Sequence, residues 1–418
     1  MLVYTRVFGE SAPQAFLLSG PDATVGELIE RVRSVRSAKG RDVSLLGGVV
    51  DPSSRLADVG VHEGDLVDVV ASGEARAAEP AATLDSGVDL EALKAHVPAA
   101  PKRLTEYEEV TQLLQWGAPY HINGDRPSHQ VWTSDSTVLR ASDWATYRSP
   151  DKLYYRTYTS RQAKAERAVS TAFKFAADSG QLAQVDPEHV ALMRSVVGAL
   201  QYPDWGLCVV HQHATRFALS SWIAGATEFM MFDELRHAQL YARVGLAYGE
   251  VHEGFDDPRQ GWMDDERLQG TRRLIEELLA ELDWGKAVVL AGIVIEPVLT
   301  SVVHAMLTSR SIRAGDALTP FVCQSIAEDK ARHRDSAAEF LQLVATDRAH
   351  GESNREHVEE WVRDWLPRAV EAATSLAAGD AAGMAALAQT QDWIVELLES
   401  AGLAADIFTP TTVGASGR

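Results

Sequence analysis

The spacing of hydrophobic positions changes near residue 72 and divides the chain into two regions. In the first region, runs such as "LVYTRVF" alternate apolar and polar residues, as half-buried β-strands do. A later run, "ATVGELIERVRSVRSA", repeats its apolar residues at helical spacing, and the strand-like runs "DVSLLGGVV" and "GDLVDVVAS" follow it. The order strand, strand, helix, strand, strand predicts a small α+β domain over residues 1–72.

The end of this domain, "LADVGVHEGDLVDVV", resembles the last turn and strand of ubiquitin-like folds. We therefore expect a ubiquitin-like domain of the β-grasp type. Its sequence has no recognisable catalytic set of residues and no C-terminal Gly-Gly tail for conjugation. Because a fold by itself specifies no chemistry, docking to a partner is the function that we expect of this domain.

The second region is dominated by helical periodicity. Residues 73–88 are rich in Ala, Glu, Pro and Gly and have no strong period, so they predict a linker, and residues 73–99 together form the linker and the start of an arm. From residue 100 to residue 405 we expect a helical bundle, because the predicted helices are long and their connections short. The predicted helices span residues 160–179, 188–200, 205–248, 265–282, 284–310, 317–346 and 354–376.

Composition and charge exclude several classes of function. The chain has 418 residues and a formal net charge of -20, so a phosphate backbone or an anionic membrane would be repelled over most of its surface. The longest apolar run, "AVVLAGIVIEPVL", is too short to span a bilayer and is interrupted by Glu296 and Pro297. Cys208 and Cys323 lie in apolar helical patterns and predict buried thiols. With no signal-peptide pattern at its start, the chain is predicted to be soluble and cytoplasmic.

Two helical stretches carry closely related sequences. Residues 233–237 read "DELRH" and residues 329–333 read "DKARH", so Asp, Arg and His recur at identical offsets. Positions i and i+3 share one helix face, which directs Glu234 and His237 toward the same point. A lone Glu-x-x-His pair is more often structural than a metal ligand, but the doubled pattern is typical of ferritin-like diiron bundles, in which two such pairs and two single Glu residues hold two metal ions. The doubled motif predicts a ferritin-like helical bundle.

The ligand set that a diiron centre needs is incomplete. Lys330 stands three positions before His333, where the second pair requires a carboxylate. Glu296 lies 34 residues before Lys330 on the preceding apolar helix and is a candidate single carboxylate. The matching helix of the first half has no acidic residue between Asp204 and Glu228. The candidate ligand positions are therefore Glu234, His237, Glu296 and His333, with His211 or His213 on the helix that lacks its glutamate.

The Lys330 side chain changes the charge balance of such a site. A buried ammonium group would form an ion pair with Glu234 or Glu296, because either charge alone is costly to bury. Two ferrous ions in the same volume would face that fixed positive charge with too few carboxylates to balance them. We therefore expect a salt-bridged relic in which these residues are vestigial ligand positions, with no metal, no other cofactor and no catalytic residue in this chain.

These features resemble the bacterial multicomponent monooxygenases, which are the soluble methane, toluene, phenol, alkene and propane oxidising enzymes. The chain is most similar to the small or β subunit of their hydroxylase, through the incomplete ligand set, the placement of His211 23 residues before Glu234, and the segment "WATYRSPDKLYYRTYTSRQ" at residues 144–162. The resemblance covers about residues 100–400. It implies a non-catalytic subunit that packs on an α subunit bearing the diiron centre, in a hetero-oligomer served by a reductase and a small coupling protein. That complex would hydroxylate small hydrocarbons or aromatics with O2 and NADH-derived electrons.

Two features depart from this family pattern. The first is the N-terminal domain, which is similar to the separate β-grasp-like γ subunit of some members and implies a fusion of γ-like and β-like parts. The second is the intact "DELRH" sequence, which leaves open an alternative: a self-sufficient diiron or mononuclear iron oxidase that uses the residual ligands. A third, weaker alternative is a scaffold whose ubiquitin-like domain recruits an unrelated partner. The aromatic segment at residues 100–160 predicts an arm that wraps a partner, and no residue specifies the substrate.

Overall fold

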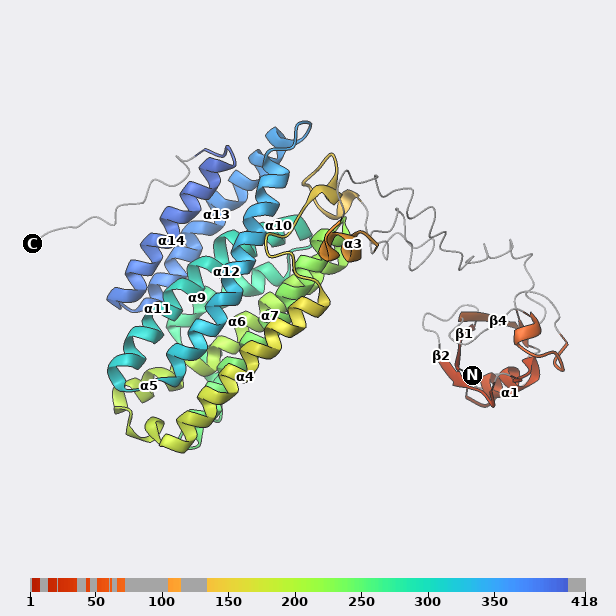
Figure 1. Ribbon diagram of the computed structural model, residues 1–418, viewed down its shortest axis with the longest axis horizontal. Coiled ribbons are helices and arrows are strands. Elements are labelled where there is room, and N and C mark those ends of the chain that lie inside the picture. Colours follow the sequence, from red (N-terminus) through yellow and green to blue (C-terminus); the bar gives the residue numbers. More distant parts are fainter. Residues whose placement is uncertain are drawn as a thin grey trace, which may run out of the picture. The chain divides into compact units, whose positions relative to one another are not determined.

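The computed structural model describes residues 2–7, 14–20, 22–35, 43–45, 51–59, 61, 66–71, 104–113 and 134–404. The chain divides into two compact units, Met1–Lys94 and Ala95–Arg418 (Figure 1). The linker predicted at residues 73–99 lies outside the described residues, as do residues 100–103 and 114–133 of the predicted arm. The predicted domain limits therefore stay predictions.

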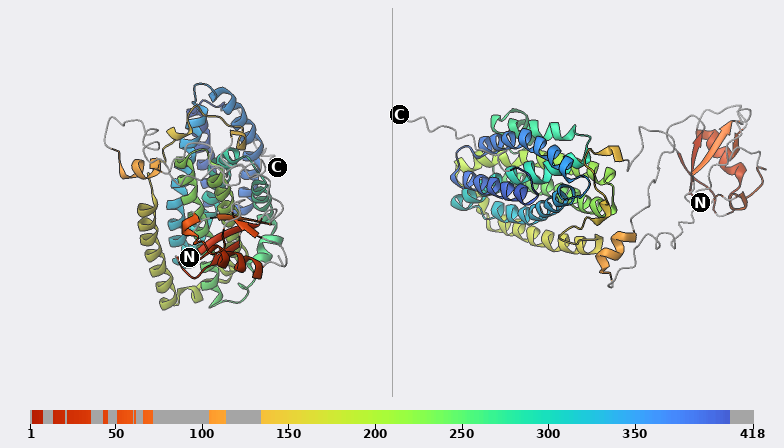
Figure 2. Two further views of the ribbon diagram at one scale, coloured as in Figure 1. Left: turned by 90° about the vertical axis from the view of Figure 1, so that its right-hand side faces the viewer. Right: turned by 90° about the horizontal axis from the view of Figure 1, so that it is seen from above.

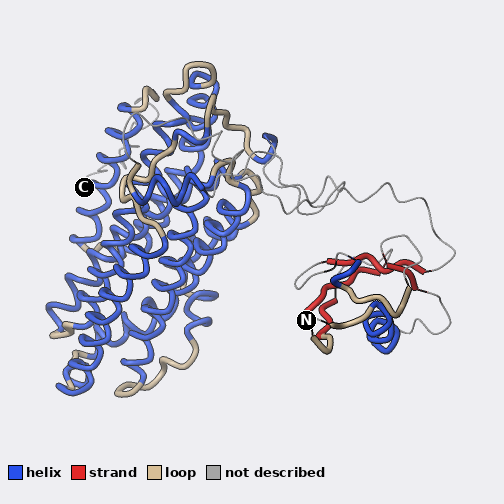
Figure 3. The backbone as a smooth tube through the Cα atoms, turned by 45° about the vertical axis from the view of Figure 1, so that its right-hand side comes forward, coloured by secondary structure: helices blue, strands red, loops and turns tan. Residues whose placement is uncertain are grey.

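The N-terminal unit is a four-stranded sheet with one α-helix among its described residues. Its central strands, β1 (Leu2–Val7) and β4 (Leu66–Ala71), are parallel. Strands β2 (Gln14–Leu17) and β3 (Val43–Leu45) flank them in antiparallel pairs and give the order β2-β1-β4-β3. Helix α1 (Val25–Val35) lies on one face of this sheet (Figure 3).

Helical spacing explains why α1 packs against the sheet. Its apolar residues Val25, Leu28, Ile29 and Val32 stand at i, i+3, i+4 and i+7, and all four are buried. They join Val3, Phe16 and Leu56 in a separate small hydrophobic core. This unit therefore has a core of its own, apart from the core of the helical unit.

The second unit is a bundle of long helices that run side by side, which confirms the predicted helical class (Figures 1 and 2). Helix α14 packs on α11, and α6 packs on α7. The α-helices are α3 (Glu106–Leu113), α4 (Tyr155–Ser179), α5 (Pro187–Val196), α6 (Gln201–Phe217), α7 (Ser221–Gly249), α8 (Pro258–Asp264), α9 (Glu266–Leu279), α10 (Trp284–Val289), α11 (Glu296–Ala314), α12 (Leu318–Ala345), α13 (Gly351–Ala377) and α14 (Ala381–Ser400). Short 3-10 turns lie at Ser134–Ser136, Trp144–Thr146, Gln181–Gln184 and Val197–Leu200.

The single helix predicted at residues 205–248 is wrong, because two helices occupy this stretch. Helix α6 ends at Phe217, and α7 begins after Ser220. The Ser220 hydroxyl accepts a hydrogen bond from the backbone N–H of Ile223, as serine does at a helix N-cap. The apolar period continues on both sides of this break, so periodicity alone conceals it. Helices α8 and α14 were also missed by the sequence analysis.

A π-helical segment, Leu290–Ile295, lies between α10 and α11, inside the stretch predicted as one helix at 284–310. Its six residues are completely buried or nearly so. At Gly292 an added Cβ atom would lie 2.5 Å from the Cβ of Ala337, so only glycine allows this close approach to α12. The wider turn places Glu296 immediately after the segment, opposite α12. Such π-segments often occur at functional sites.

The stretch Trp284–Ala314 is long and apolar enough to cross a membrane by composition. In the bundle, 83% of its most apolar window is buried against other helices. Burial in protein accounts for this hydrophobicity, as for a core helix.

Candidate functional site

The bundle brings six of the seven positions singled out in the sequence into one buried cluster. His213 is the exception, since its ring contacts Phe217 and its Nε2 atom hydrogen-bonds the carbonyl oxygen of Leu282 at 3.0 Å. The cluster lies between four helices. Helix α6 supplies His211, α7 supplies Glu234 and His237, α11 supplies Glu296, and α12 supplies Lys330 and His333.

Lys330 is at the centre of the cluster. Its Nζ atom lies 2.7 Å from both carboxylate oxygens of Glu234, 3.3 Å from Asp204 Oδ1 and 3.8 Å from Glu296 Oε2. Burial by itself would lower the pKa of the Lys330 ammonium group, but the negative charges of Asp204, Glu234 and Glu296 outweigh burial and raise it. Lys330 therefore stays charged inside the bundle.

The carboxylates respond to the same charge. Burial favours their neutral forms, but Lys330 holds the pKa of Glu234 well below its usual range and, with His333, lowers that of Glu296 to about 2. For Asp204 burial is the larger effect, and it raises the pKa to about 7 against the pull of Lys330. The cluster thus contains two firmly ionised glutamates and one aspartate that titrates near neutral pH.

Asp204 was not among the candidates drawn from the sequence. It precedes His211 by seven positions, which places both on one face of α6, and both are buried. That spacing was the available signal.

His333 connects two carboxylates. Its Nδ1 atom lies 3.0 Å from Glu296 Oε1, and its Nε2 atom lies 3.1 Å from Asp233 Oδ2. Burial opposes protonation of the ring, but Glu296, Asp233 and Glu234 together raise the pKa of His333 well above its usual value. His333 is therefore a cation that balances Glu296.

The two motifs are paired crosswise. Asp233 of the first motif accepts from Arg332 of the second at 2.6 Å, and Asp329 of the second accepts from Arg236 of the first at 3.0 Å. The histidines follow the same rule, since His237 Nε2 lies 3.3 Å from Asp329 Oδ2, just as His333 contacts Asp233. The repeated Asp and Arg offsets therefore serve to join α7 to α12, a role that the sequence analysis did not assign.

Helix α4 completes this network. The Tyr158 hydroxyl donates to Asp233 Oδ1 at 2.9 Å, and the Gln162 amide donates to Asp233 at 2.6 Å and to Asp329 at 3.1 Å. Both residues belong to the aromatic segment at 144–162 that carried the family resemblance. These contacts give the segment a structural role, because they anchor α4 to the paired motifs.

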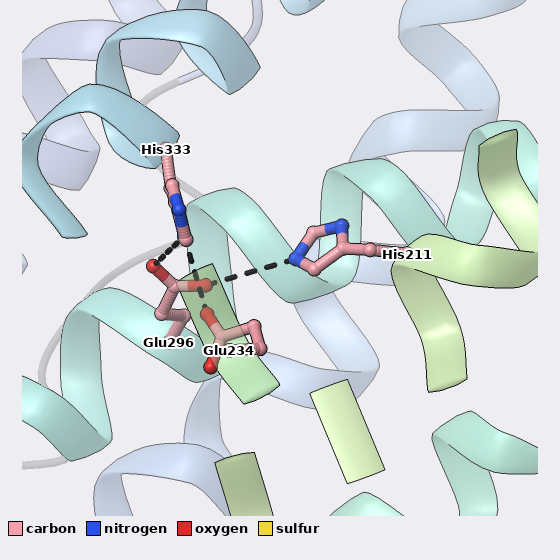
Figure 4. A group of neighbouring side chains, drawn as sticks. All are labelled: His211, Glu234, Glu296 and His333. Atoms are coloured by element: carbon pink, nitrogen blue, oxygen red, sulfur yellow. Dashed lines mark hydrogen bonds and ion pairs between the residues drawn. The ribbon is translucent and has the colours of Figure 1, made fainter. Parts of the chain in front are cut away.

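His211 is the least constrained member of the cluster. Its imidazole points toward Glu296, with Nε2 3.9 Å from Oε2 (Figure 4). Among the described residues, neither ring nitrogen has a hydrogen-bond partner. A buried imidazole of this kind is a potential metal ligand.

Two groups of side chains have the composition of a metal site. His211, Glu234, Glu296 and His333 each offer a ligand atom, and these atoms lie within 4.8 Å of one another; Asp204, Glu234 and His237 form the second group. Both groups depend on Glu234, whose two oxygens are already bound by the Lys330 ammonium group at 2.7 Å. The residues present therefore do not fit a pair of iron ions, because three carboxylates would have to balance two dications and the lysine.

Comparisons with known proteins agree with the resemblance found in the sequence. The propane 2-monooxygenase hydroxylase small subunit of Mycolicibacterium smegmatis is 27% identical over 288 residues, which cover 66% of this chain and 78% of that protein. The β subunit of the toluene-4-monooxygenase hydroxylase of Ectopseudomonas mendocina is 25% identical over 302 residues, covering 68% and 90%. The methane monooxygenase component A β chain of Methylosinus trichosporium is 25% identical over 293 residues, covering 65% and 73%.

Solved structures share the fold. Phenol hydroxylase from Pseudomonas sp. OX1 has a chain that matches with a TM-score of 0.66 at 22% identity, covering 72% of this chain and 92% of that one. Toluene 4-monooxygenase matches with a TM-score of 0.58 at 23% identity, covering 66% and 93%. The model of the Methane/Phenol/Alkene Hydroxylase family matches residues 123–348, which is more than half of the sequence. The predicted kinship with hydroxylase small subunits is thus confirmed, and the chain belongs to the methane/phenol/alkene hydroxylase family.

Proposed function

We propose that this chain is the non-catalytic β subunit of a multicomponent monooxygenase hydroxylase. It packs against an α subunit that carries the diiron centre, and the complex hydroxylates small hydrocarbons or aromatics with O2 and NADH-derived electrons. A reductase and a coupling protein act on the assembled complex, which we place in the cytoplasm. The observation that carries this proposal is the Lys330 ammonium group, bound to both oxygens of Glu234.

The ammonium group argues against metal chemistry on energetic grounds. A metal ion that took Glu234 as a ligand would have to displace Lys330, and the displaced ammonium would need another partner. Breaking a buried ion pair by removing one partner costs about 3–5 kcal/mol. In this chain Lys330 stabilises the bundle with the positive charge that metal ions would otherwise provide.

Exposed apolar side chains support assembly with a partner. Large hydrophobic residues on the bundle are well exposed, among them Phe175 (62%), Leu246 (68%) and Ile312 (65%). Exposed apolar surface of this kind often marks a protein interface. We propose that part of it is covered by the α subunit.

The N-terminal unit is proposed to be a ubiquitin-like β-grasp domain that docks to another component, as a γ-like part fused to the β-like bundle. Support comes from the sheet order β2-β1-β4-β3, the parallel central pair and the helix that follows the first two strands. The separate hydrophobic core is consistent with a module that folds by itself.

The iron content of the full chain, purified alone from iron-replete cells, tests the proposal. We expect well-folded protein with far less than one iron per chain and no oxygen consumption. Co-expression with the α subunit should yield a stable complex in which iron is bound in proportion to the α subunit. Stoichiometric iron in the isolated chain would contradict the non-catalytic assignment.

One observation favours a second candidate. The four-residue group His211, Glu234, Glu296 and His333 is dense enough to hold one metal ion, and among the described residues neither nitrogen of the His211 ring has a hydrogen-bond partner. Because this group could hold one ion and the cluster does not fit two, the observation favours the mononuclear form of the self-sufficient iron oxidase. One iron per chain, together with oxygen consumption in the absence of any partner, would favour it.

A further inference from the structure

Helix α4 lies at the edge of the bundle and has one long exposed face (Figures 1 and 2). It packs on α12 and α7, and its buried residues are Tyr158, Val169 and Ala176. Its other side carries a stripe of exposed residues at alternating spacings of three and four positions, which places them on one helix face. The stripe consists of Arg161, Lys164, Ala168, Thr171 and Phe175.

The C-terminal half of this stripe borders an open apolar groove of about 530 Å³ between α4 and the start of α12. Ala168, Thr171 and Phe175 line the groove from α4, and Phe321 lines it from α12. The Phe175 and Phe321 side chains are both well exposed, at 62% and 42%. Single exposed apolar residues are normal, but two phenylalanines that share one groove form a patch of the kind that marks a protein interface.

The N-terminal half of the stripe is positively charged, although the chain has a formal net charge of -20. Helix α4 contains five basic residues and two acidic ones. One of the acidic residues, Glu166, is bound by Arg243 of α7 at 2.5 Å, so it does not neutralise the stripe. Among the described residues, no carboxylate forms an ion pair with Arg161 or Lys164. Two exposed cations therefore stand next to the apolar groove without counter-charges.

Both halves of the stripe suit the same kind of partner. Spacings of three and four residues are those by which two helices pack side by side at a small crossing angle. Apolar side chains of such a helix would cover Phe175 and Phe321, while its carboxylates would meet Arg161 and Lys164. At a rise of 1.5 Å per residue the stripe is about 21 Å long, so a partner helix of about four turns covers it.

We propose that the groove is the docking site for an amphipathic helix of the α subunit, with acidic residues facing Arg161 and Lys164 and an apolar residue between Phe175 and Phe321. This inference rests on the proposed function, which requires an α subunit, and it assigns the surface and the chemistry of one contact. An apolar anchor in a pocket supplies most of the binding energy at such contacts. The charges beside it select the partner and make binding depend on salt.

Two exposed alanines on α4 provide a matched pair of variants. Ala168 lines the groove, whereas Ala163 lies outside it. A tagged full chain is co-expressed with the α subunit, and the α subunit retained on the affinity resin is measured. Ala168→Trp fills the groove and should reduce the retained α subunit at least about tenfold, while Ala163→Trp should leave it unchanged. Since both positions are exposed, both variants should keep the circular dichroism of the native chain.

Charge reversal tests the other half of the stripe. The double variant Arg161→Glu, Lys164→Glu should lose the α subunit at lower salt than the native chain does. The double variant Arg259→Glu, Arg363→Glu changes the net charge equally at two exposed arginines outside α4 and should behave as the native chain. Equal losses in the two double variants would contradict a specific role for the charges on α4.

The remaining outcomes separate this inference from the proposed function. Normal assembly of both Ala168→Trp and the α4 charge-reversed variant would overturn the docking site and leave the proposed function intact. A native chain that retains no α subunit would contradict the proposed function and, with it, the partner assigned to the groove. If assembly is normal and only binding to phosphatidylglycerol vesicles is lost on charge reversal, the face binds an anionic membrane and the inference is wrong.

Discussion

Lys330 holds the buried carboxylates of the bundle together, and its loss should show this directly. In Lys330→Met the Glu234 carboxylate keeps its burial and loses its closest cation. We expect the free energy of unfolding to fall by about 3–5 kcal/mol. Denaturant titration monitored by circular dichroism measures the change.

The exposed pair Lys174 and Asp178 provides the control for this prediction. Its charged atoms are 2.8 Å apart, nearly the same as the 2.7 Å between Lys330 and Glu234, but both side chains are more than 60% exposed. Lys174→Met should therefore change stability by less than about 1 kcal/mol. A similar loss in both variants would argue that the buried position of Lys330 has no special role.

The lowered pKa of Glu296 predicts that the stability of the bundle depends on pH in the acidic range. Its folded pKa of about 2 lies below the usual value of 4.5, so its ionised form stabilises the fold fully above about pH 4.5. That contribution is lost as the pH falls from 4.5 toward 2, and a shift of this size corresponds to about 3 kcal/mol. The unfolding free energy of Glu296→Gln should vary less with pH across this window than that of the native chain. Identical slopes would show that folding does not lower the pKa of Glu296.

At the scale of elements, the π-segment and α12 depend on one close contact. Gly292→Ala would force a methyl group to within 2.5 Å of the Ala337 Cβ atom, so we expect a loss of about 1–3 kcal/mol and a lower melting temperature. The double variant with Ala337→Gly should recover part of that loss, because it removes the opposing atom.

Gly225 on α7 is the matched control for Gly292. A Cβ atom added there meets nothing within 4 Å. Gly225→Ala should therefore stabilise the bundle by about 0.5–1 kcal/mol, through the better helix propensity of alanine. Destabilisation by both substitutions would indicate that glycine in these helices matters for a reason other than the contact with Ala337.

The helices also mark the limit of sequence reasoning at this scale. Apolar period predicted α4, α9, α12 and α13 to within a few residues, because each has a buried stripe. The apolar period predicted α6 and α7 as one helix, because the sequence is apolar on both sides of Ser220. The period also could not distinguish a π-helical turn from an α-helical turn at residues 290–295. Helix capping and local helix pitch depend on individual hydrogen bonds. The spacing of apolar residues carries no information about those bonds.

At the scale of the whole molecule, we expect the two units to have roles that can be separated by deleting one of them. A chain that lacks residues 1–75 should keep its helical circular dichroism and its thermal transition, since the bundle has its own core. If the N-terminal unit docks to another component, the shortened chain should lose assembly in a pull-down with the co-expressed hydroxylase components. Retained assembly would assign docking to the bundle alone.

The sequence by itself determined the helical class, the doubled Asp-x-x-Arg-His pattern and the replacement of a carboxylate by Lys330, because each depends only on residue type and spacing. It also indicated the family. Only the tertiary structure decided that Asp204 joins the cluster, that His213 does not, and that each motif's Asp binds the Arg and His of the other. The physical reason is that spacing along a helix places side chains on a face, whereas the packing of helices decides which faces meet and which charges become partners.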